Sequence, residues 1–170
     1  MVQIVDSLAE ISDRYDAVFC DVWGCLHDGV RALPEAVAAL RAFRAKGGKV
    51  VLLTNAPRPR ADVAAQFGQF EVPQDCWDTI ATSGDSARVA MFQGVIGDKV
   101  YFMGKDYDLT FFDPPAIVDD PTDVRRVPLD EATGIACLGP FDAQADPEVN
   151  RRLDHLTTAR YEAAQNPDFA

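Results

Sequence analysis

The strongest constraint on the fold of this chain is an alternation of short apolar runs with segments of helical periodicity. Three runs are rich in apolar and β-branched residues: Ala17–Cys20, Lys49–Leu53 and Asp78–Thr82. The first two are typical of parallel strands buried on both faces, and the third is expected to be a further strand. Between the first two, the spacing predicts a helix that begins at Pro34 and stops before Gly48, because proline favours the first turn and glycine the end.

Two further helices are predicted, one over Pro59–Phe67 and one from Ser83 to Phe92. Right-handed crossovers would then set the three strands side by side in a parallel sheet. The carboxyl ends of parallel strands meet at one edge of a sheet, so Asp21 and Thr54 are expected to lie there with Ser83. The sequence therefore predicts an α/β fold with its polar groups gathered at one edge.

A second, smaller α/β unit is predicted after this sheet, which divides the chain into residues 1–82 and 83–170. Strands are expected at Val100–Met103 and Thr133–Leu138, separated by a stretch dense in Asp and Pro. Its acid-rich part, Asp113 to Asp130, lacks the spacing of a calcium loop and is interpreted as a solvated loop. A last helix is expected to open at residues 146–148.

The composition excludes several classes of function. A chain of 170 residues with 48% hydrophobic content can bury a core, and its net charge of -11 argues against nucleic acid or an anionic membrane as a partner. Neither a membrane-spanning run nor a signal peptide is recognisable, so a cytoplasmic protein is expected. The four cysteines form no CxxC pair and are expected to be reduced and mostly buried. Two histidines are too few for a histidine-rich zinc site.

The predicted sheet edge carries groups suited to phosphoryl transfer. Asp21 offers an anionic oxygen, and Thr54 offers a hydroxyl, with Asn55 adding a backbone amide. Gly24 allows the chain to approach a ligand closely. Donors in a rigid loop after a buried strand suit the nonbridging oxygens of a phosphate, so a phosphate site is predicted here.

These residues resemble motifs of the haloacid dehalogenase superfamily, and within it the class IIA branch of 4-nitrophenyl phosphatase-like enzymes. The matching segments are Asp21–Gly29, Leu52–Asn55, Ile80–Gly84 and, as a cap element, Asn166–Asp168. The resemblance covers nearly the whole chain. It implies a Rossmannoid core with an incomplete parallel sheet, followed by a smaller α/β cap.

The resemblance also implies roles for individual residues. Asp21 would attack phosphorus and form an aspartyl-phosphate, while Thr54 and the Asn55 amide hold the phosphate, with Gly24 in the same cradle. Mg²⁺ would be bound by the Asp21 carboxylate and the Trp23 backbone carbonyl. The implied activity is a magnesium-dependent phosphatase of small phosphorylated metabolites.

The chain departs from the family pattern in two ways. Trp23 stands where the family has an acid that protonates the leaving group, a function worth about 100- to 10,000-fold in rate, so slow turnover or none is expected. The family's later lysine and Gly-Asp motifs are not found before Ala170. From this we expect weak metal binding, and one of three outcomes: a fragment of a longer chain, self-association through an exposed sheet edge, or a rearranged termination.

Several alternatives stay open on the sequence alone. His27 is either a solvent-exposed residue or a base within reach of the phosphate, and Trp23 is a packing residue more readily than a platform for substrate. Arg58 either meets an anionic substrate or simply keeps the surface soluble. The competing function is a noncatalytic phosphate-binding or interaction module on the same fold.

Overall fold

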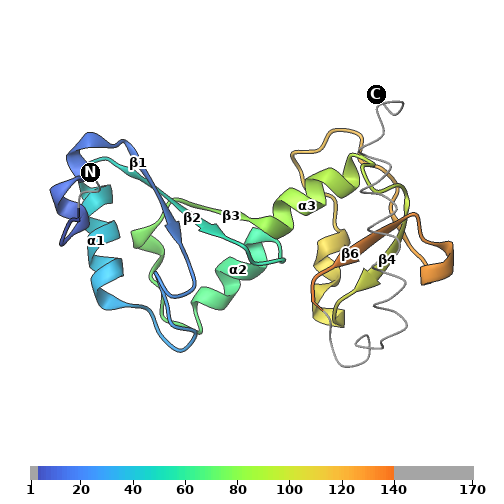
Figure 1. Ribbon diagram of the computed structural model, residues 1–170, viewed down its shortest axis with the longest axis horizontal. Coiled ribbons are helices and arrows are strands. Elements are labelled where there is room, and N and C mark those ends of the chain that lie inside the picture. Colours follow the sequence, from blue (N-terminus) through green and yellow to red (C-terminus); the bar gives the residue numbers. More distant parts are fainter. Residues whose placement is uncertain (1–3, 140–170) are drawn as a thin grey trace.

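The fold is described from a computed structural model, which defines residues 4–139. Its first unit, residues 4–82, is built on a parallel sheet in the order β1-β2-β3 (Figure 1). Its elements are η1 (Leu8–Glu10), η2 (Ser12–Arg14), β1 (Ala17–Asp21), α1 (Pro34–Ala45), β2 (Lys49–Thr54), α2 (Arg60–Phe67), η3 (Gln74–Cys76) and β3 (Thr79–Thr82). This order confirms the predicted alternation of strands and helices.

The core of the first unit lies on one face of its sheet. Val50 and Leu52 of the central strand are fully buried, and the apolar stripes of α1 and α2 pack on this face. The burial of β2 alternates along the strand, so the other face is open among the described residues. Phe19 is 69% exposed there and Leu53 is 51% exposed. The expectation of strands buried on both faces is therefore wrong for residues 4–139.

The second unit, residues 83–139, begins directly at the end of β3. Its elements are α3 (Ser83–Phe92), β4 (Lys99–Met103), η4 (Asp106–Phe112), β5 (Arg125–Arg126), η5 (Leu129–Glu131) and β6 (Gly134–Cys137). The three strands form a second parallel sheet in the order β5-β4-β6. In Figure 1, α3 runs from the end of the first sheet toward the second.

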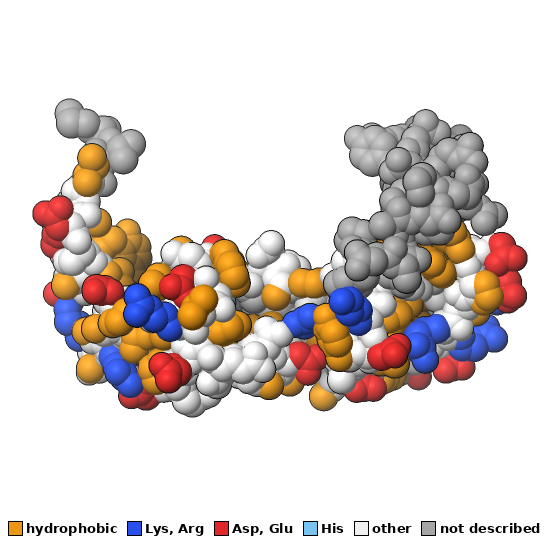
Figure 2. Space-filling model, turned by 90° about the horizontal axis from the view of Figure 1, so that it is seen from below, with side chains coloured by type: hydrophobic (Ala, Val, Ile, Leu, Met, Phe, Trp, Pro, Cys, Tyr) orange, Lys and Arg blue, Asp and Glu red, His pale blue; other side chains and the backbone are white. Residues whose placement is uncertain are grey.

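The second unit confirms two predicted strands and adds elements that were not predicted. β4 and β6 match the two expected runs to within one residue at each end. β5 and part of η5 lie in the stretch Asp113–Asp130 that was expected to be a loop, and η4 was not predicted. Over the surface shown in Figure 2, acidic and basic side chains are interspersed with hydrophobic ones on both units. The helix expected at 146–148 and the cap element at Asn166–Asp168 lie outside the described residues.

The mixed α/β class with parallel sheets is thus confirmed. Among the described residues, β1 pairs only with β2 and is an edge strand. Self-association through this edge stays a prediction. Within residues 4–139, none of the helices has the length and apolar character needed to cross a membrane.

Candidate functional site

Asp21 lies at the carboxyl end of β1 with its side chain exposed. The sheet register pairs Asp21 with Leu53 and pairs Thr54 with Thr82, so Asp21 and Thr54 sit at neighbouring strand ends. The Asp21 Oδ1 accepts a hydrogen bond from the Val22 N–H at 2.7 Å. This contact fixes the carboxylate at the strand end while its second oxygen has no hydrogen bond within residues 4–139.

The chain turns tightly after Asp21 because the Val22 carbonyl accepts two backbone hydrogen bonds. The donors are the N–H groups of Leu26, at 2.9 Å, and His27, at 3.2 Å. Gly24 has φ +77°, a left-handed conformation that glycine adopts without strain, and its N–H donates to the His27 carbonyl at 2.8 Å. Gly24 therefore shapes the turn, and its own amide is used within it.

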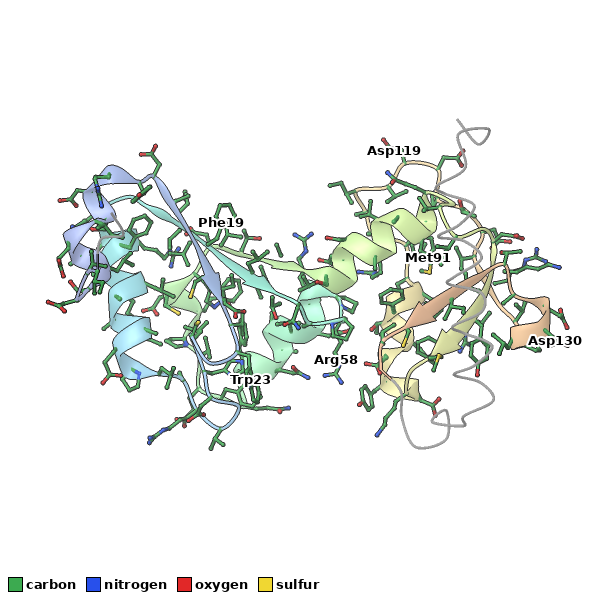
Figure 3. The ribbon with its side chains drawn as sticks, in the orientation of Figure 1. Phe19, Trp23, Arg58, Met91, Asp119 and Asp130 are labelled. Atoms are coloured by element: carbon green, nitrogen blue, oxygen red, sulfur yellow. The ribbon has the colours of Figure 1, made fainter. Side chains whose placement is uncertain are left out.

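Trp23, His27 and Gly29 form one packed group, which we call the indole cluster. The Trp23 ring meets His27 edge to face at 5.6 Å, and a Cβ on Gly29 would lie 2.2 Å from the indole. Trp23 is nevertheless 65% exposed, with its outer surface open. Figure 3 shows Trp23 close to the turn that follows β1.

His27 is buried, so the alternative of a solvent-exposed histidine is wrong. Its ring stacks on Phe70 at 4.5 Å, and its Nδ1 accepts a hydrogen bond from the Gly29 N–H at 3.1 Å. Burial lowers the pKa of His27, against a smaller opposing effect from Asp28. These contacts favour a packing role, and a role as a catalytic base stays a prediction.

Thr54 is buried at the end of β2, and its Oγ1 accepts a hydrogen bond from the Ala56 N–H at 3.2 Å. The hydroxyl proton is left to donate to a ligand oxygen. Asn55 follows with an exposed side chain that makes no hydrogen bond within the described residues. At the sheet edge, Thr54 thus supplies a hydroxyl held in place by a hydrogen bond, and Asn55 supplies an exposed side-chain amide.

Arg58 is engaged with the second unit rather than free at the sheet edge. Its Nε donates to the Asp108 Oδ1 at 3.0 Å, and its guanidinium lies 4.9 Å from the centre of the Tyr107 ring. Asp108 is only 2% exposed. In Figure 3, Arg58 lies between the two units. Binding of substrate by Arg58 stays a prediction, and it would have to compete with this ion pair.

A buried arginine in α3, Arg88, was not predicted from the sequence. Arg88 forms an ion pair with Asp85 at 3.0 Å, and its Nε donates to the Phe111 carbonyl at 3.1 Å. Its Nη2 also donates to the Asp113 carbonyl. The residue therefore fastens η4 to α3, and its position on the apolar side of a predicted helix was the only available signal.

The cysteines contribute no activated thiol next to Asp21. All four are free, as expected, although Cys25 and Cys137 are exposed rather than buried. Cys20 precedes Asp21, and burial raises the pKa of its thiol to about 11. A thiolate nucleophile is therefore not favoured at this position.

The atoms near Asp21 that could bind a metal ion are oxygens, the ligand atoms that Mg²⁺ prefers. The Trp23 carbonyl accepts no hydrogen bond from any residue that the structure describes, so it and the Asp21 carboxylate can both serve as ligands. Residues 4–139 contain no group of three or more His, Cys, Asp or Glu side chains arranged for a metal. The fit to Mg²⁺ is partial, with water and substrate oxygens left to complete the coordination.

Comparison with known proteins gives a consistent family. A sequence model for haloacid dehalogenase-like hydrolases matches residues 18–113. The structure is similar to the crystal structure of a haloacid dehalogenase-like family hydrolase from Brucella suis 1330, with 36% identity and a TM-score of 0.76; the match covers 93% of this chain and 57% of that one. No curated protein sequence matches the chain.

A second solved structure shares the fold at lower identity. It is described as a "possible sugar phosphatase, HAD superfamily" from Cytophaga hutchinsonii ATCC 33406, with 18% identity and a TM-score of 0.58; the match covers 92% of this chain and 56% of that one. The chain thus spans little more than half the length of each of these two structures. From the matched family model and the 36% identical structure, the chain belongs to the haloacid dehalogenase-like hydrolase family.

Proposed function

We propose that this chain carries the nucleophile half of a phosphatase site that acts on small phosphorylated metabolites. The observation that supports it most is the exposed Asp21 carboxylate at the end of β1, next to the strand that ends in Thr54, at the carboxyl edge of the first sheet. Class IIA is the branch we propose, with the unit that begins at Ser83 as its cap.

In the proposed reaction, an Asp21 carboxylate oxygen attacks phosphorus and displaces the leaving group, and water then hydrolyses the aspartyl-phosphate. The Thr54 hydroxyl donates to a nonbridging oxygen, together with the Asn55 amide. Within residues 4–139 the Trp23 N–H has no acceptor, so this amide is a further donor from the turn. Gly24 contributes by giving the turn its shape.

Mg²⁺ is the proposed cofactor, held by the Asp21 carboxylate and the Trp23 carbonyl. When bound, it would neutralise charge on the phosphate oxygens. Replacing an acid by Trp23 leaves this main-chain ligand in place. It removes a side chain that could give a proton to the leaving group, so we expect slow turnover.

The experiment is a phosphatase assay with 4-nitrophenyl phosphate and a panel of metabolite phosphates, with and without Mg²⁺. Asp21→Asn should lower kcat/KM on the order of 10⁴-fold or more, since it removes the nucleophile. Asp16→Asn is the matched control, because Asp16 is exposed at the opposite end of the same strand. Activity that survives Asp21→Asn would refute the mechanism.

The competing function is a noncatalytic phosphate-binding module, and Trp23 is the observation in its favour. An indole at this position can keep the binding geometry while proton donation is lost. Calorimetry with orthophosphate in the presence of Mg²⁺ separates the two functions. Binding that Asp21→Asn weakens, without hydrolysis of any ester, would identify the binding module.

A further inference from the structure

The loop that follows β2 rests directly on the first turn of α3. We call residues 54–58 the 54–58 loop, and it opens at Thr54, whose Oγ1 accepts a hydrogen bond from the Ala56 N–H at 3.2 Å. The Ala56 carbonyl in turn accepts a hydrogen bond from the Gly84 N–H at 3.0 Å. A Cβ on Gly84 would lie 2.3 Å from the Pro57 carbonyl oxygen, so the two backbones are in direct contact. The start of the second unit therefore supports the middle of the loop.

The end of the loop is tied to η4 by a buried carboxylate. The Asp108 Oδ1 accepts a hydrogen bond from the Arg58 Nε at 3.0 Å, and its Oδ2 accepts one from the Lys105 N–H at 3.2 Å. The Asp108 side chain is 2% exposed, and that of Arg58 is 27% exposed. A carboxylate taken so far out of water needs charged and hydrogen-bonding partners, and a partly buried guanidinium needs its counterion. Each of the two side chains therefore constrains the other.

Apolar packing does not fill the space between the loop and the rest of the second unit. An apolar cavity of about 380 Å³ lies there among the described residues. Asn55 and Pro57 line it from the loop, and apolar side chains that include Met91 and Phe111 line it from the second unit. In Figure 3, Met91 lies on α3 and Arg58 lies between the two units. Van der Waals attraction falls off steeply across a gap, so the polar contacts of the loop set its position on this side.

The sequence of the loop makes it stiff. Pro57 and Pro59 flank Arg58, and proline fixes its own φ at about −65°. Proline also confines the residue before it to extended conformations, and those residues are here Ala56 and Arg58. Few backbone torsions between Arg58 and Thr54 are left to absorb a displacement. A shift of Arg58 is therefore passed along the loop to Thr54.

We propose that Asp108 is a positioning residue of the phosphate site. Through Arg58 it holds the 54–58 loop, so that Thr54 and Asn55 keep their places at the sheet edge where Asp21 ends the neighbouring strand. This inference rests on the proposed phosphatase function and adds a buried residue of the second unit to its site. Asp108 acts through one ion pair and without contacting the phosphate.

Amide hydrogen exchange, followed by NMR in the 170-residue chain, tests the proposal without a ligand. The Ala56 N–H is the reporter, because it donates to the Thr54 Oγ1. Asp108→Ala should speed its exchange by about tenfold. The Val50 N–H near the start of β2, which donates to the Asp78 Oδ2 at 2.8 Å, should keep its native rate. Unchanged exchange at Ala56 would overturn the proposal.

A second contact between the units supplies the control. The Thr110 hydroxyl donates to the Asp62 Oδ2 at 2.7 Å, which joins η4 to α2 rather than to the 54–58 loop. Thr110→Val removes this hydrogen bond at nearly constant volume and should leave exchange at Ala56 at its native rate. Equal acceleration in Thr110→Val and Asp108→Ala would overturn the proposal, since a general loosening of the units would explain both.

A double-variant cycle tests the route through Arg58. Arg58→Gln breaks the same ion pair from its more exposed partner and should speed exchange at Ala56 as Asp108→Ala does. It also provides the test if Asp108→Ala does not fold. Combining the two changes should add nothing further, because both remove one interaction. Additive effects would show that Asp108 acts by another route and would overturn the proposal.

Kinetics with 4-nitrophenyl phosphate connect the loop to the proposed reaction. Thr54 would hold the phosphate in the ground state and the transition state alike, so Asp108→Ala should raise KM by about tenfold with kcat nearly unchanged. A smaller folded fraction would instead lower kcat and leave KM at its native value, and that result would overturn the proposal. Thr110→Val should leave both constants at their native values.

The outcomes separate this inference from the proposed function. Suppose that the native chain neither hydrolyses 4-nitrophenyl phosphate nor binds orthophosphate in calorimetry. The proposed function is then wrong, while faster exchange at Ala56 in Asp108→Ala still supports Asp108 as the residue that positions the loop. If the chain is active and Asp108→Ala alters neither exchange at Ala56 nor KM, the phosphatase stands and this inference is wrong.

Discussion

The two units of this molecule differ in what their residues are arranged to do. The first unit has the larger described core, in which α1 and α2 pack on the central strand, and it carries Asp21 and Thr54 at its edge. The second unit has a smaller core around Val100 and Phe111, and it supplies most of the apolar cavity. Groups that act on a phosphate, as we propose for Asp21 and Thr54, need a precisely held frame.

Polar side-chain contacts join the two units. Arg58 pairs with Asp108, and the Thr110 hydroxyl donates to the Asp62 Oδ2 at 2.7 Å. Both tryptophans, Trp23 and Trp77, lie in the first unit. Tryptophan fluorescence therefore reports on one unit and circular dichroism on both, which makes the comparison testable.

The largest effect is expected from the core of the first unit. Leu52 is fully buried in the central strand, so Leu52→Ala should lower the free energy of unfolding by about 2 to 5 kcal/mol. Urea unfolding followed by tryptophan fluorescence measures it. Val100→Ala, a fully buried site of β4, should shift the circular dichroism transition more than the fluorescence one. If the fluorescence and circular dichroism transitions shift equally in both variants, the two units unfold as one, and the proposed difference between the units is wrong.

The next effect is expected where the units meet. Asp108→Ala should cost about 1 to 3 kcal/mol, because it leaves the partly buried Arg58 guanidinium without its buried partner. The fluorescence and circular dichroism transitions should also separate further. Asp106→Ala is the matched control, an exposed aspartate of the same short helix. Equal effects of the two variants would show that the ion pair does not join the units.

A smaller effect is expected inside the first unit at low pH. The pKa of Asp78 is lowered to about 2, most strongly by the hydrogen bond from the Val50 N–H and next by the hydrogen bond from Arg44. Its stabilising contribution is present above the unfolded pKa of about 3.9 and is lost as the pH falls toward 2. Fluorescence-detected urea midpoints from pH 5 to pH 2 should therefore fall less steeply in Asp78→Asn. Asp130→Asn in the second unit should keep the native slope.

The smallest effect is expected at His27 near neutral pH. Its pKa is lowered by burial, so the unfolded chain binds a proton first, and stability should fall as the pH drops below about 6.5. His27→Gln should flatten this dependence between pH 8 and pH 5.5. A native pH dependence that persists in His27→Gln would assign the proton to another group.

The sequence predicted the first sheet well because its signals are local. The apolar runs placed all three strands close to their observed bounds, and Pro34 and Gly48 did the same for the two ends of α1. The sequence also predicted that Asp21 and Thr54 lie at one edge of the sheet. This follows from the parallel direction of the strands alone and needs no information on side-chain packing. β5 was missed because its two exposed arginines have no strand pattern, and only pairing with β4 defines it.

The remaining site details depend on contacts that are distant in sequence. The pairing of Arg58 with Asp108 joins residues 50 positions apart, and no local pattern marks either partner. The burial of His27 likewise depends on Phe70, which arrives from the segment after α2. The open face of the first sheet was not foreseen, because an apolar run looks the same whether one face or both are covered.

The indole cluster has a consequence for how this site can change over evolution. Because the Trp23 ring covers His27 and occupies the space where a Cβ of residue 29 would stand, these three positions are interdependent. Placing an aspartate at position 23 would uncover the histidine and the bare glycine turn in the same step. A single Trp23→Asp substitution would thus lose packing in the same step that introduces a candidate general acid, so the effect of a change at position 23 depends on positions 27 and 29.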